Sequence, residues 1–349
     1  MILPHSYMAA LLLTVLSMIC WGSWANTQKL TGKWRFELFY FDYTFGLMIA
    51  AIVAAFTFGS LGFQFGSGGD GFQFLDDLAR AGRRNMAYGL GAGVVFNLAN
   101  MLLVAAIAVA GMSVAFPVAI GLAMVIGVVG NYFVKPQGNP SLLFLGVAVV
   151  VAAIILDAVA YRAHSLKESG KEIKAGKTRH VVPRVSWRGI VLSVVSGVLM
   201  GSFYPLVEMG KQGDAGLGPY AISFLFALGV FISTFIFNLF FMNLPVQGEP
   251  VEIPAYFRGT MKQHLLGLLG GVIWAVGTIS NFVVASAPDA HLGPAISYGL
   301  GQGATLISAL WGLLIWKEFR GAVPKVKLYL TLMILLFAIG LTLISTAAL

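Results

Sequence analysis

The residues of this sequence that could do chemistry are uncharged polar side chains set within apolar runs. Asn97 and Asn100 lie three positions apart, which places both amides on one face of a helix. Tyr298 and Gln302, four positions apart, share a helix face in the same way. Lipid offers no hydrogen bonds, so such groups are expected to face a cavity or a neighbouring helix. They can therefore bind a small polar molecule, or they can join helices to one another.

Aromatic rings accompany these polar groups in both halves of the chain. Trp21 and Asn26 occur towards the end of the first apolar run, and Trp274 and Asn281 share a later one. An indole ring can stack on a planar or sugar-like ligand, although Trp near a membrane surface is also typical of the interfacial belt. We predict a substrate-binding site made of eight residues: Trp21, Asn26, Asn97, Asn100, Trp274, Asn281, Tyr298 and Gln302.

Acidic residues are scarce in the apolar runs, so each of them is informative. An ionised side chain at mid-membrane costs about 2.5 to 3.5 kcal/mol on the mildest scale. Asp42 begins the second run, where it either caps a helix or takes up a proton. Glu208 follows Pro205 and either pairs with Lys211 or exchanges a proton near the helix break. We identify Asp42 and Glu208 as candidate proton-coupling residues; Asp157 is a further embedded carboxylate.

The sequence contains no constellation of residues that is typical of an enzyme. It has no HExxH motif and no nucleophile elbow, and its five histidines are scattered over loops and the edges of apolar runs. The single cysteine, Cys20, can form neither an internal disulfide nor a metal cluster. We therefore expect a protein that is not an enzyme, without a cofactor or a bound metal.

The elements that must position these residues are helices that cross a membrane. The 349-residue chain is 58% hydrophobic and 10% charged, with a mean hydropathy of +0.86, which leaves too little polar surface for a water-soluble domain. Runs of about twenty continuous apolar residues can span a bilayer as helices, and they lack the alternation of barrel strands. Ten such runs occur, at 6–26, 41–61, 86–109, 113–134, 141–161, 189–209, 219–241, 263–286, 292–315 and 327–347.

The two halves of the chain carry the same short motifs at a nearly constant spacing. A Gly-Ser pair at Gly22 recurs at Gly201, and a Gly-Leu pair at Gly121 recurs at Gly299. The distances along the chain between the two members of each set are almost identical. If each copy contains five spans, this odd number makes the second copy enter the bilayer in the opposite orientation. We therefore predict an all-α integral membrane protein of ten transmembrane helices, built as two inverted five-helix repeats.

A basic segment at 162–188 separates the two predicted repeats, which occupy 1–161 and 189–349. Its Gly176-Lys177-Thr178 ending is similar to a phosphate-binding loop, but Lys171 stands where that motif needs its first glycine. We interpret the segment as a cytoplasmic linker that carries charge, rather than as a nucleotide-binding site.

The distribution of basic residues indicates a membrane topology. The sequence pI of about 9.6 could suggest nucleic-acid binding, but 17 of the 22 Lys and Arg residues follow spans one, five, seven and nine. Because cytoplasmic loops carry an excess of Lys and Arg, this pattern places both termini outside the cytoplasm. We expect a multi-pass protein of the inner (plasma) membrane whose partners are a small-molecule substrate, protons and membrane lipid, and not nucleic acid.

The beginning of the chain resembles the ureide permease family. The resemblance is carried by the run Cys20-Trp-Gly-Ser-Trp-Ala-Asn-Thr-Gln-Lys29 and by Phe39-Tyr-Phe-Asp-Tyr-Thr44, which opens the second span. The ten-span plan is similar to the wider drug/metabolite transporter superfamily (DMT/EamA-like), including its rhamnose and glucose uptake permeases. The resemblance implies proton-coupled uptake of small polar heterocycles such as allantoin or uracil. Plant ureide permeases have a longer central loop than the linker of this chain.

These observations together predict a secondary-active transporter of a small polar metabolite. The expected substrate is a ureide, a nucleobase-like heterocycle or a sugar, taken up with protons by alternating access. Export of drugs or amino acids, as elsewhere in the same superfamily, is the alternative. A membrane enzyme or scaffold would need a polar catalytic cluster or a large extramembrane domain, and the sequence indicates neither.

Overall fold

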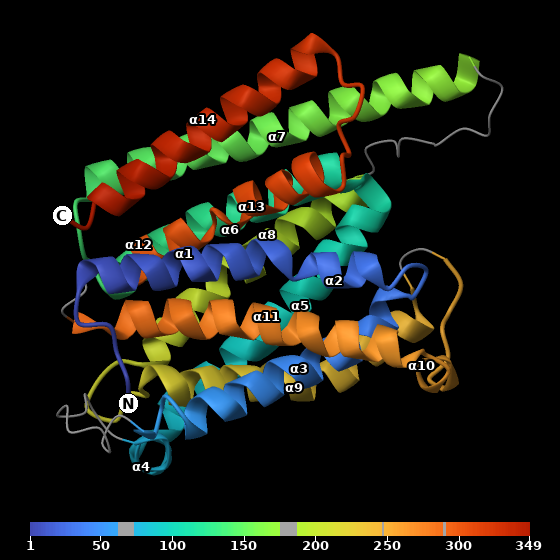
Figure 1. Cartoon of the computed structure of the whole chain (residues 1–349). Helices are drawn as coiled ribbons and strands as arrows, with labels where there is room; N and C mark the ends of the chain where they lie inside the picture. Colours follow the sequence, from blue (N-terminus) through green and yellow to red (C-terminus); the bar gives the residue numbers. More distant parts are fainter. Residues whose placement is uncertain (62–72, 175–186, 246–247, 289–290) are drawn as a thin grey trace.

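The computed structural model describes residues 1–61, 73–174, 187–245, 248–288 and 291–349. Regular structure in these ranges is helical (Figure 1). Ten helical segments are long and apolar enough to cross a membrane, which confirms the predicted number of spans. They are α1 (Tyr7–Ser23) continued by α2 (Ala25–Leu30), α3 (Phe36–Phe56), α5 (Arg83–Ala110), α6 (Met112–Val134), α7 (Pro140–Lys174), α8 (Trp187–Gly210), α9 (Pro219–Asn243), α11 (Met261–Ser286), α12 (Pro294–Gly301) continued by α13 (Ala304–Leu310) and the π-helical turn η3 (Trp311–Ile315), and α14 (Pro324–Thr346). Two short helices, α4 (Phe74–Arg80) and α10 (Pro254–Phe257), lie between spans.

The second span lies earlier in the chain than its apolar run suggested. α3 begins at Phe36 and ends at Phe56, whereas the run was placed at 41–61. Its first turn contains Glu37, which lowers the local hydropathy but is favourable at a helix N-terminus. Asp42 therefore lies inside the helix, and the expectation that it caps this helix is wrong.

The fifth span continues beyond the apolar run that predicted it. α7 extends from Pro140 to Lys174, so the first part of the expected linker is helical. The sequence after residue 161 is polar but rich in Lys and Glu, which favour helix without requiring an apolar face. The rest of the linker up to residue 186, with Gly176-Lys177-Thr178, lies outside the described residues.

Several helix ends follow from local sequence. Pro219, Pro294 and Pro324 begin α9, α12 and α14, where a missing N–H costs nothing and the fixed φ suits the first turn. Thr260 and Gln263 form a reciprocal capping box at the start of α11. Gly111, with φ of 78°, is the single residue between α5 and α6, so these two spans form a tight hairpin.

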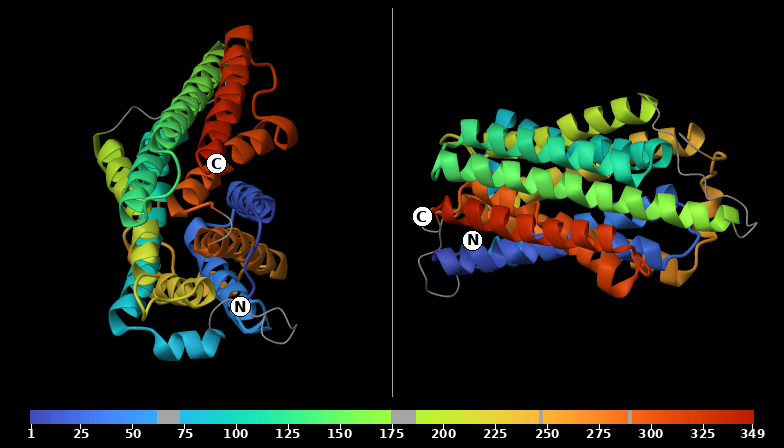
Figure 2. Two further views of the ribbon diagram at one scale, coloured as in Figure 1. Left: turned by 90° about the vertical axis from the view of Figure 1, so that its left-hand side faces the viewer. Right: turned by 90° about the horizontal axis from the view of Figure 1, so that it is seen from above.

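The helices form one bundle in which segments from the two halves of the chain are interleaved (Figure 1). α8 packs against α5 and α6, and α11 packs against α3 and α1. α7 and α14 pack along each other and lie at one edge of the bundle (Figure 2). Both chain termini lie at the same end of the bundle, as an even number of spans requires (Figure 1).

Two helix crossings bring backbone against backbone. A Cβ atom added at Gly93 on α5 would collide with the carbonyl oxygen of Phe226 on α9. A Cβ atom added at Gly271 on α11 would collide with the carbonyl oxygen of Tyr43 on α3. Only glycine allows such an approach between membrane helices. Gly93 and Gly271 are separated along the chain by the same interval as the repeated Gly-Leu pairs.

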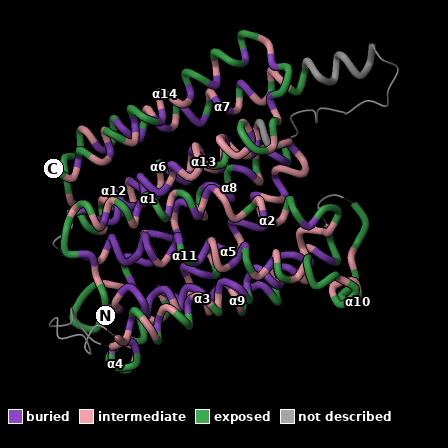
Figure 3. Tube along the Cα trace, viewed as in Figure 1, coloured by how far each residue is buried: buried purple, intermediate pink, exposed green. Residues whose placement is uncertain are grey.

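The outward faces of the spans are apolar. Exposed large hydrophobic side chains occur on many spans, among them Ile49, Ile155, Ile236 and Ile339. Figure 3 shows buried positions along the inner faces of the central helices and exposed positions on the outside of the bundle. A continuous apolar exterior of this kind suits contact with lipid rather than water.

Candidate substrate-binding site

A cavity of about 180 Å³ lies inside the bundle, between helices of both halves. Aromatic rings form much of its wall, and none of the described lining residues is charged. Five of the eight predicted site residues line it: Trp21, Asn100, Trp274, Tyr298 and Gln302. An apolar cavity with a few convergent polar groups is typical of a small-molecule site.

Stacked indole rings form one side of this cavity. The rings of Trp21 and Trp274 are stacked with centroids 6.3 Å apart and planes inclined by 20°. Trp21 Nε1 donates a hydrogen bond to Thr278 Oγ1 over 2.9 Å, which fixes the orientation of its ring. Phe96 packs on Trp274 with ring centroids 4.5 Å apart. Trp21 therefore lies in the bundle interior and not in an interfacial belt.

Two amide side chains at the cavity wall have hydrogen-bonding groups left over. Asn100 Nδ2 donates to the Tyr40 hydroxyl over 3.1 Å, and its Oδ1 has no bond within the described chain. Gln302 lies between α12 and α13, and the described residues offer its side chain no hydrogen-bond partner. The interruption of the ninth span thus presents an amide to the cavity, as broken helices do in other carriers.

The other three predicted amides lie outside the cavity wall and connect helices. Asn97 Nδ2 donates to Ser233 Oγ over 2.8 Å, and its Oδ1 accepts from Tyr40 over 2.9 Å. Asn26 Oδ1 accepts from Trp316 Nε1 over 2.5 Å. Asn281 is fully buried and bonded on both sides of its amide. In the conformation observed, these three residues make polar contacts within the bundle, which was the alternative to contact with a ligand.

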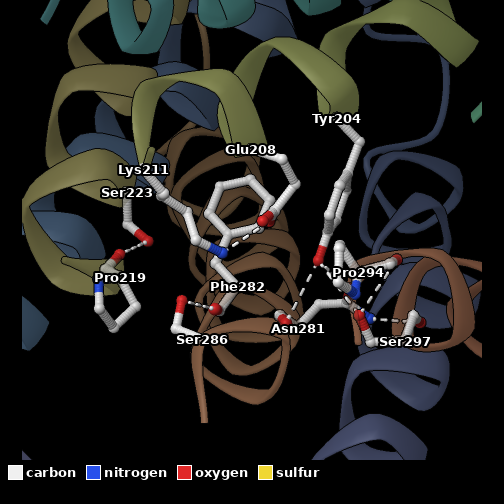
Figure 4. Close-up of polar contacts among 10 residues, drawn as sticks. All are labelled: Tyr204, Glu208, Lys211, Pro219, Ser223, Asn281, Phe282, Ser286, Pro294 and Ser297. Carbon is white, nitrogen blue, oxygen red and sulfur yellow. Dashed lines mark hydrogen bonds and ion pairs between the residues drawn. The ribbon is translucent and has the colours of Figure 1, made fainter. Parts of the chain in front are cut away.

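A layer of polar contacts centres on Asn281, outside the residues that line the cavity (Figure 4). The Tyr204 hydroxyl donates to Asn281 Oδ1 over 2.6 Å, and Asn281 Nδ2 donates to the Ser297 carbonyl oxygen over 3.0 Å. These bonds join α8, α11 and α12 of the second half, and Asn281 Nδ2 also donates to Ser17 Oγ on α1 over 3.3 Å, which connects the layer to the first half.

Glu208 is paired with Lys211, which was the structural alternative to proton exchange. Lys211 Nζ lies 2.6 Å from Glu208 Oε1, and both side chains are buried (Figure 4). Burial lowers the pKa of Lys211, and the neighbouring carboxylate opposes that shift. Glu208 is absent from the cavity wall.

Asp42 belongs to a separate cluster at the start of α11. The carboxylate accepts hydrogen bonds from the Tyr256 hydroxyl over 2.6 Å and from His264 Nδ1 over 2.8 Å. Burial raises the pKa of Tyr256, and its bond to the carboxylate adds to the shift. The sequence did not indicate this cluster because Asp42 lies 214 residues from Tyr256 and 222 residues from His264 along the chain.

A polar cluster at the end of the bundle joins the first, fifth and ninth spans. Lys29 Nζ lies 2.5 Å from one oxygen of Glu318, and the Tyr161 hydroxyl lies 2.5 Å from the other. Burial would raise the pKa of Glu318, but these two hydrogen bonds and the Lys29 charge together lower it. Lys29 also lies 4.3 Å from the centre of the Trp316 ring. We missed this cluster because Glu318 follows its span.

Phe96 and Phe203 also line the cavity and were not predicted. Phenylalanine within an apolar run carries no sequence signal that distinguishes cavity wall from core. Among the described residues, no group of three or more His, Cys, Asp or Glu side chains is placed to hold a metal ion.

The fold and the cavity define an integral, multi-pass membrane protein with a small-molecule site between its halves. The family model described as ureide permease matches residues 39–182. Ureide permease 2 of Arabidopsis thaliana is 24% identical, with 94% of each chain covered. Ureide permease 1 of the same plant is 21% identical, covering 96% of this chain and 95% of its own. These matches show that the chain is similar to the ureide permease family, whose members are transporters and not enzymes.

More distant similarities are also found. Transmembrane protein 144 homolog B of Dictyostelium discoideum is 26% identical over 45% of this chain and 40% of its own. A solved structure described only as the crystal structure of a protein shares the fold, with a TM-score of 0.57 and 14% sequence identity. The alignment covers 97% of this chain and 99% of that one, so the likeness extends over the whole bundle.

Proposed function

We propose that this permease takes up a small, polar, uncharged metabolite together with protons. The proposed substrate is a ureide, a nucleobase-like heterocycle or a sugar, moved by alternating access in a secondary-active cycle. The observation that carries the proposal is the uncharged cavity between the two halves, with stacked indoles on one side and available amides of Asn100 and Gln302.

The chemistry of the cavity favours a planar, neutral ligand. The indole rings of Trp21 and Trp274 offer flat apolar surface to a ring, and amides can match the C=O and N–H groups of a ureide or nucleobase. A charged ligand would be left without a counter-ion among the described lining residues. The names of the plant relatives, ureide permeases, agree with this class of substrate.

Two inverted five-helix repeats of the drug/metabolite transporter type, near the rhamnose and glucose permeases, form the proposed scaffold. Reciprocal packing supports this architecture. A Cβ at Gly46 on α3 would collide with the Leu268 carbonyl oxygen on α11, and one at Gly229 on α9 with that of Leu90 on α5. Leu90 and Leu268 are separated along the chain by the same interval as Gly93 and Gly271. α5 and α11 are the third and eighth spans, and α3 and α9 are the second and seventh. Replacing each helix by its counterpart in the other proposed repeat therefore converts the α5–α9 crossing into the α11–α3 crossing.

The position of the cavity along the spans supports the proposed alternating access. The cavity is lined by the end of α1, which leads to a basic loop assigned to the cytoplasm, and by residues of α5 and α6, which meet at Gly111 on the same proposed side. The opposite end is closed by Tyr204, Asn281 and the Glu208–Lys211 pair. Opening towards the outside, where both termini are proposed to lie, would require these bonds to break.

Proton coupling is assigned to Asp42 and Glu208, the embedded carboxylates indicated by the sequence. Each is bonded to a group that can exchange protons: His264 and Tyr256 for Asp42, and Lys211 for Glu208. Breaking either contact in the outward conformation would leave a buried carboxylate that takes up a proton more readily. Replacing both residues by alanine should make uptake insensitive to a pH gradient, and unchanged sensitivity would contradict their role.

The function is tested with purified protein, first by binding and then by transport. A thermal-shift screen against ureides, nucleobases and sugars should reveal a ligand that raises the melting temperature. That ligand should then accumulate in proteoliposomes under an acid-outside pH gradient, and collapse of the gradient should stop accumulation. Transport that occurs only in the outward direction would favour the exporter alternative, and an absence of any transported ligand from these classes would contradict the proposal.

A further inference from the structure

A small chamber of about 50 Å³ adjoins the substrate cavity on the side of α7. Phe116, Thr305 and Ser308 line both spaces, so the two are separated by shared side chains. Asp157 on α7 is the one carboxylate among the nine described residues that line the chamber. The chamber therefore places an acidic group next to the proposed substrate site, although the cavity itself contains none.

Asp157 differs from the other embedded carboxylates in what surrounds it. The residue is 8% exposed, and its Oδ1 is buried without a hydrogen-bond partner in the described chain. Asp42 accepts two hydrogen bonds and Glu208 is paired with an ammonium group. A buried carboxylate without a donor or a cation is stable mainly in its neutral form, because burial penalises the charge.

The ionisable groups around Asp157 are committed to other contacts or lie on other faces. Tyr161, one turn along α7, donates its hydroxyl to Glu318, and Lys29 is paired with that same carboxylate. No described lysine or arginine forms an ion pair with Asp157. Among the described lining residues, α6 contributes Phe116 and Pro117, which are apolar, and α13 contributes Thr305, Ser308 and Ala309. Two further titratable groups lie nearby, His164 against Phe319 and Tyr329 of α14 in the adjoining apolar cluster.

We propose that Asp157 is a proton-binding site of the transport cycle, in addition to Asp42 and Glu208. This inference rests on the proton-coupled uptake proposed above. A proton needs a single oxygen atom, whereas a hard metal cation collects about six oxygen ligands. Thr305 and Ser308 face both the chamber and the cavity, so a bound substrate and a proton on Asp157 share neighbours. In this conformation the site lies towards the proposed cytoplasmic side, where a proton would be released.

The transport test compares Asp157→Asn with the wild-type permease in proteoliposomes. Asparagine keeps the shape of a neutral aspartic acid but cannot release a proton. Exchange of labelled for unlabelled substrate at equal pH should continue, while accumulation should no longer follow a pH gradient, which drives about tenfold per unit in a one-proton symporter. Asp76→Asn, at an exposed position on α4, is the matched control and should behave as wild type.

Three outcomes would overturn the inference. Asp157→Asn could accumulate substrate as the wild type does, it could lose exchange together with accumulation, or the wild type could follow a sodium gradient instead. The proposed function fails separately, if the wild-type protein transports no ligand of the expected classes.

A labelling experiment tests proton binding independently of transport. Dicyclohexylcarbodiimide reacts with protonated carboxyl groups in apolar surroundings, and mass spectrometry locates the adduct. Labelling of Asp157 should increase as the pH falls and should be absent from Asp157→Asn. An Asp157 that is unlabelled at both alkaline and mildly acidic pH would overturn the inference, even if transport is observed.

Discussion

Gln302 and Asn97 are both amides within spans, yet the structure gives them different roles. Gln302 faces the cavity at the break between α12 and α13, and its side chain has no bond within the described chain. Asn97 is fully buried and bonded to Tyr40 and Ser233. The two residues therefore separate recognition of a ligand from stability of the bundle, and substitutions at them should have opposite effects.

Replacing Gln302 by leucine should weaken ligand binding without destabilising the protein. The substitution removes an amide that has no partner in the described chain and that we propose contacts the ligand. One such hydrogen bond is worth about 0.5 to 1.5 kcal/mol, or roughly tenfold in affinity. Ligand titration by thermal shift measures this loss. Gln212→Leu, at an exposed site after α8, is the matched control and should bind as wild type. Equal affinity of the two variants would remove Gln302 from the site.

Replacing Asn97 by leucine should destabilise the protein and leave ligand affinity intact. The change deprives the buried Tyr40 hydroxyl of its acceptor, which costs about 1 to 3 kcal/mol. Asn243→Leu removes an exposed amide that bonds only within its own helix, and it should be nearly neutral. Melting temperatures in detergent, with and without ligand, distinguish the cases. A stable Asn97→Leu protein that fails to bind would place this residue in recognition instead.

The Glu318 cluster predicts how stability depends on pH. The pKa of this carboxyl is lowered from its usual 4.5, because the bonds from Lys29 and Tyr161 outweigh the effect of burial. A lowered pKa contributes stability that is complete above the unfolded value and is lost as the pH falls through the folded one. Glu318→Gln should therefore be less stable by about 0.2 to 1 kcal/mol at neutral pH. The difference from wild type should shrink in acid below that range, and a difference that grows there would contradict this account.

Residue spacing predicted which side chains share a helix face, but not what that face meets. Tyr298 and Gln302 share a face and both line the cavity. Asn97 and Asn100 share one as well, but α9 packs against Asn97 while Asn100 remains at the wall. The neighbour of a helix face depends on packing between distant segments, which spacing along one helix does not contain. The Asp42–His264–Tyr256 cluster was missed for the same reason.

At the scale of helices, the crossings at Gly93 and Gly271 hold α5 to α9 and α11 to α3. The number of spans was predictable because apolar length follows directly from bilayer thickness. The ends of α3 and α7 were not predictable in this way, because a helix continues wherever its backbone hydrogen bonds are favourable, whatever the hydropathy of its residues. The break in the ninth span at Gln302 was not predicted either, because the sequence there is Gly301-Gln302-Gly303 and contains no proline.

Replacing Gly93 by alanine should destabilise the bundle. The added methyl group would meet the Phe226 carbonyl oxygen, and such overpacking costs about 1 to 3 kcal/mol. Gly91→Ala, two residues earlier on the same helix, is the matched control, because nothing lies within 4 Å of its added Cβ. That control should be neutral or slightly stabilising, since alanine favours helix over glycine. Equal melting temperatures for the two variants would contradict the close crossing.

At the scale of the whole molecule, ten spans bring both termini to one side, and the distribution of basic residues predicts that the opposite side faces the cytoplasm. Asp214, after the sixth span, and Arg320, after the ninth, are exposed at opposite ends of the bundle. The single native thiol, Cys20, is buried, so it interferes little with labelling of introduced cysteines.

This topology predicts how a membrane-impermeant maleimide labels intact cells. Asp214→Cys should react from outside, whereas Arg320→Cys should react only after the membrane is permeabilised. Cys20→Ser without a new cysteine is the background control. The reverse labelling pattern would contradict the predicted orientation of the protein in the membrane. The cavity observed here would then open towards the outer side.

The glycine crossings also limit which parts of the permease can move. Where a carbonyl group lies directly on a glycine, no side chain is available to change rotamer and absorb a displacement. We therefore expect α3 to move together with α11, and α5 together with α9, as two rigid pairs of helices. Rearrangement during turnover is therefore expected outside these two crossings, for example at the interruption of the ninth span between α12 and α13.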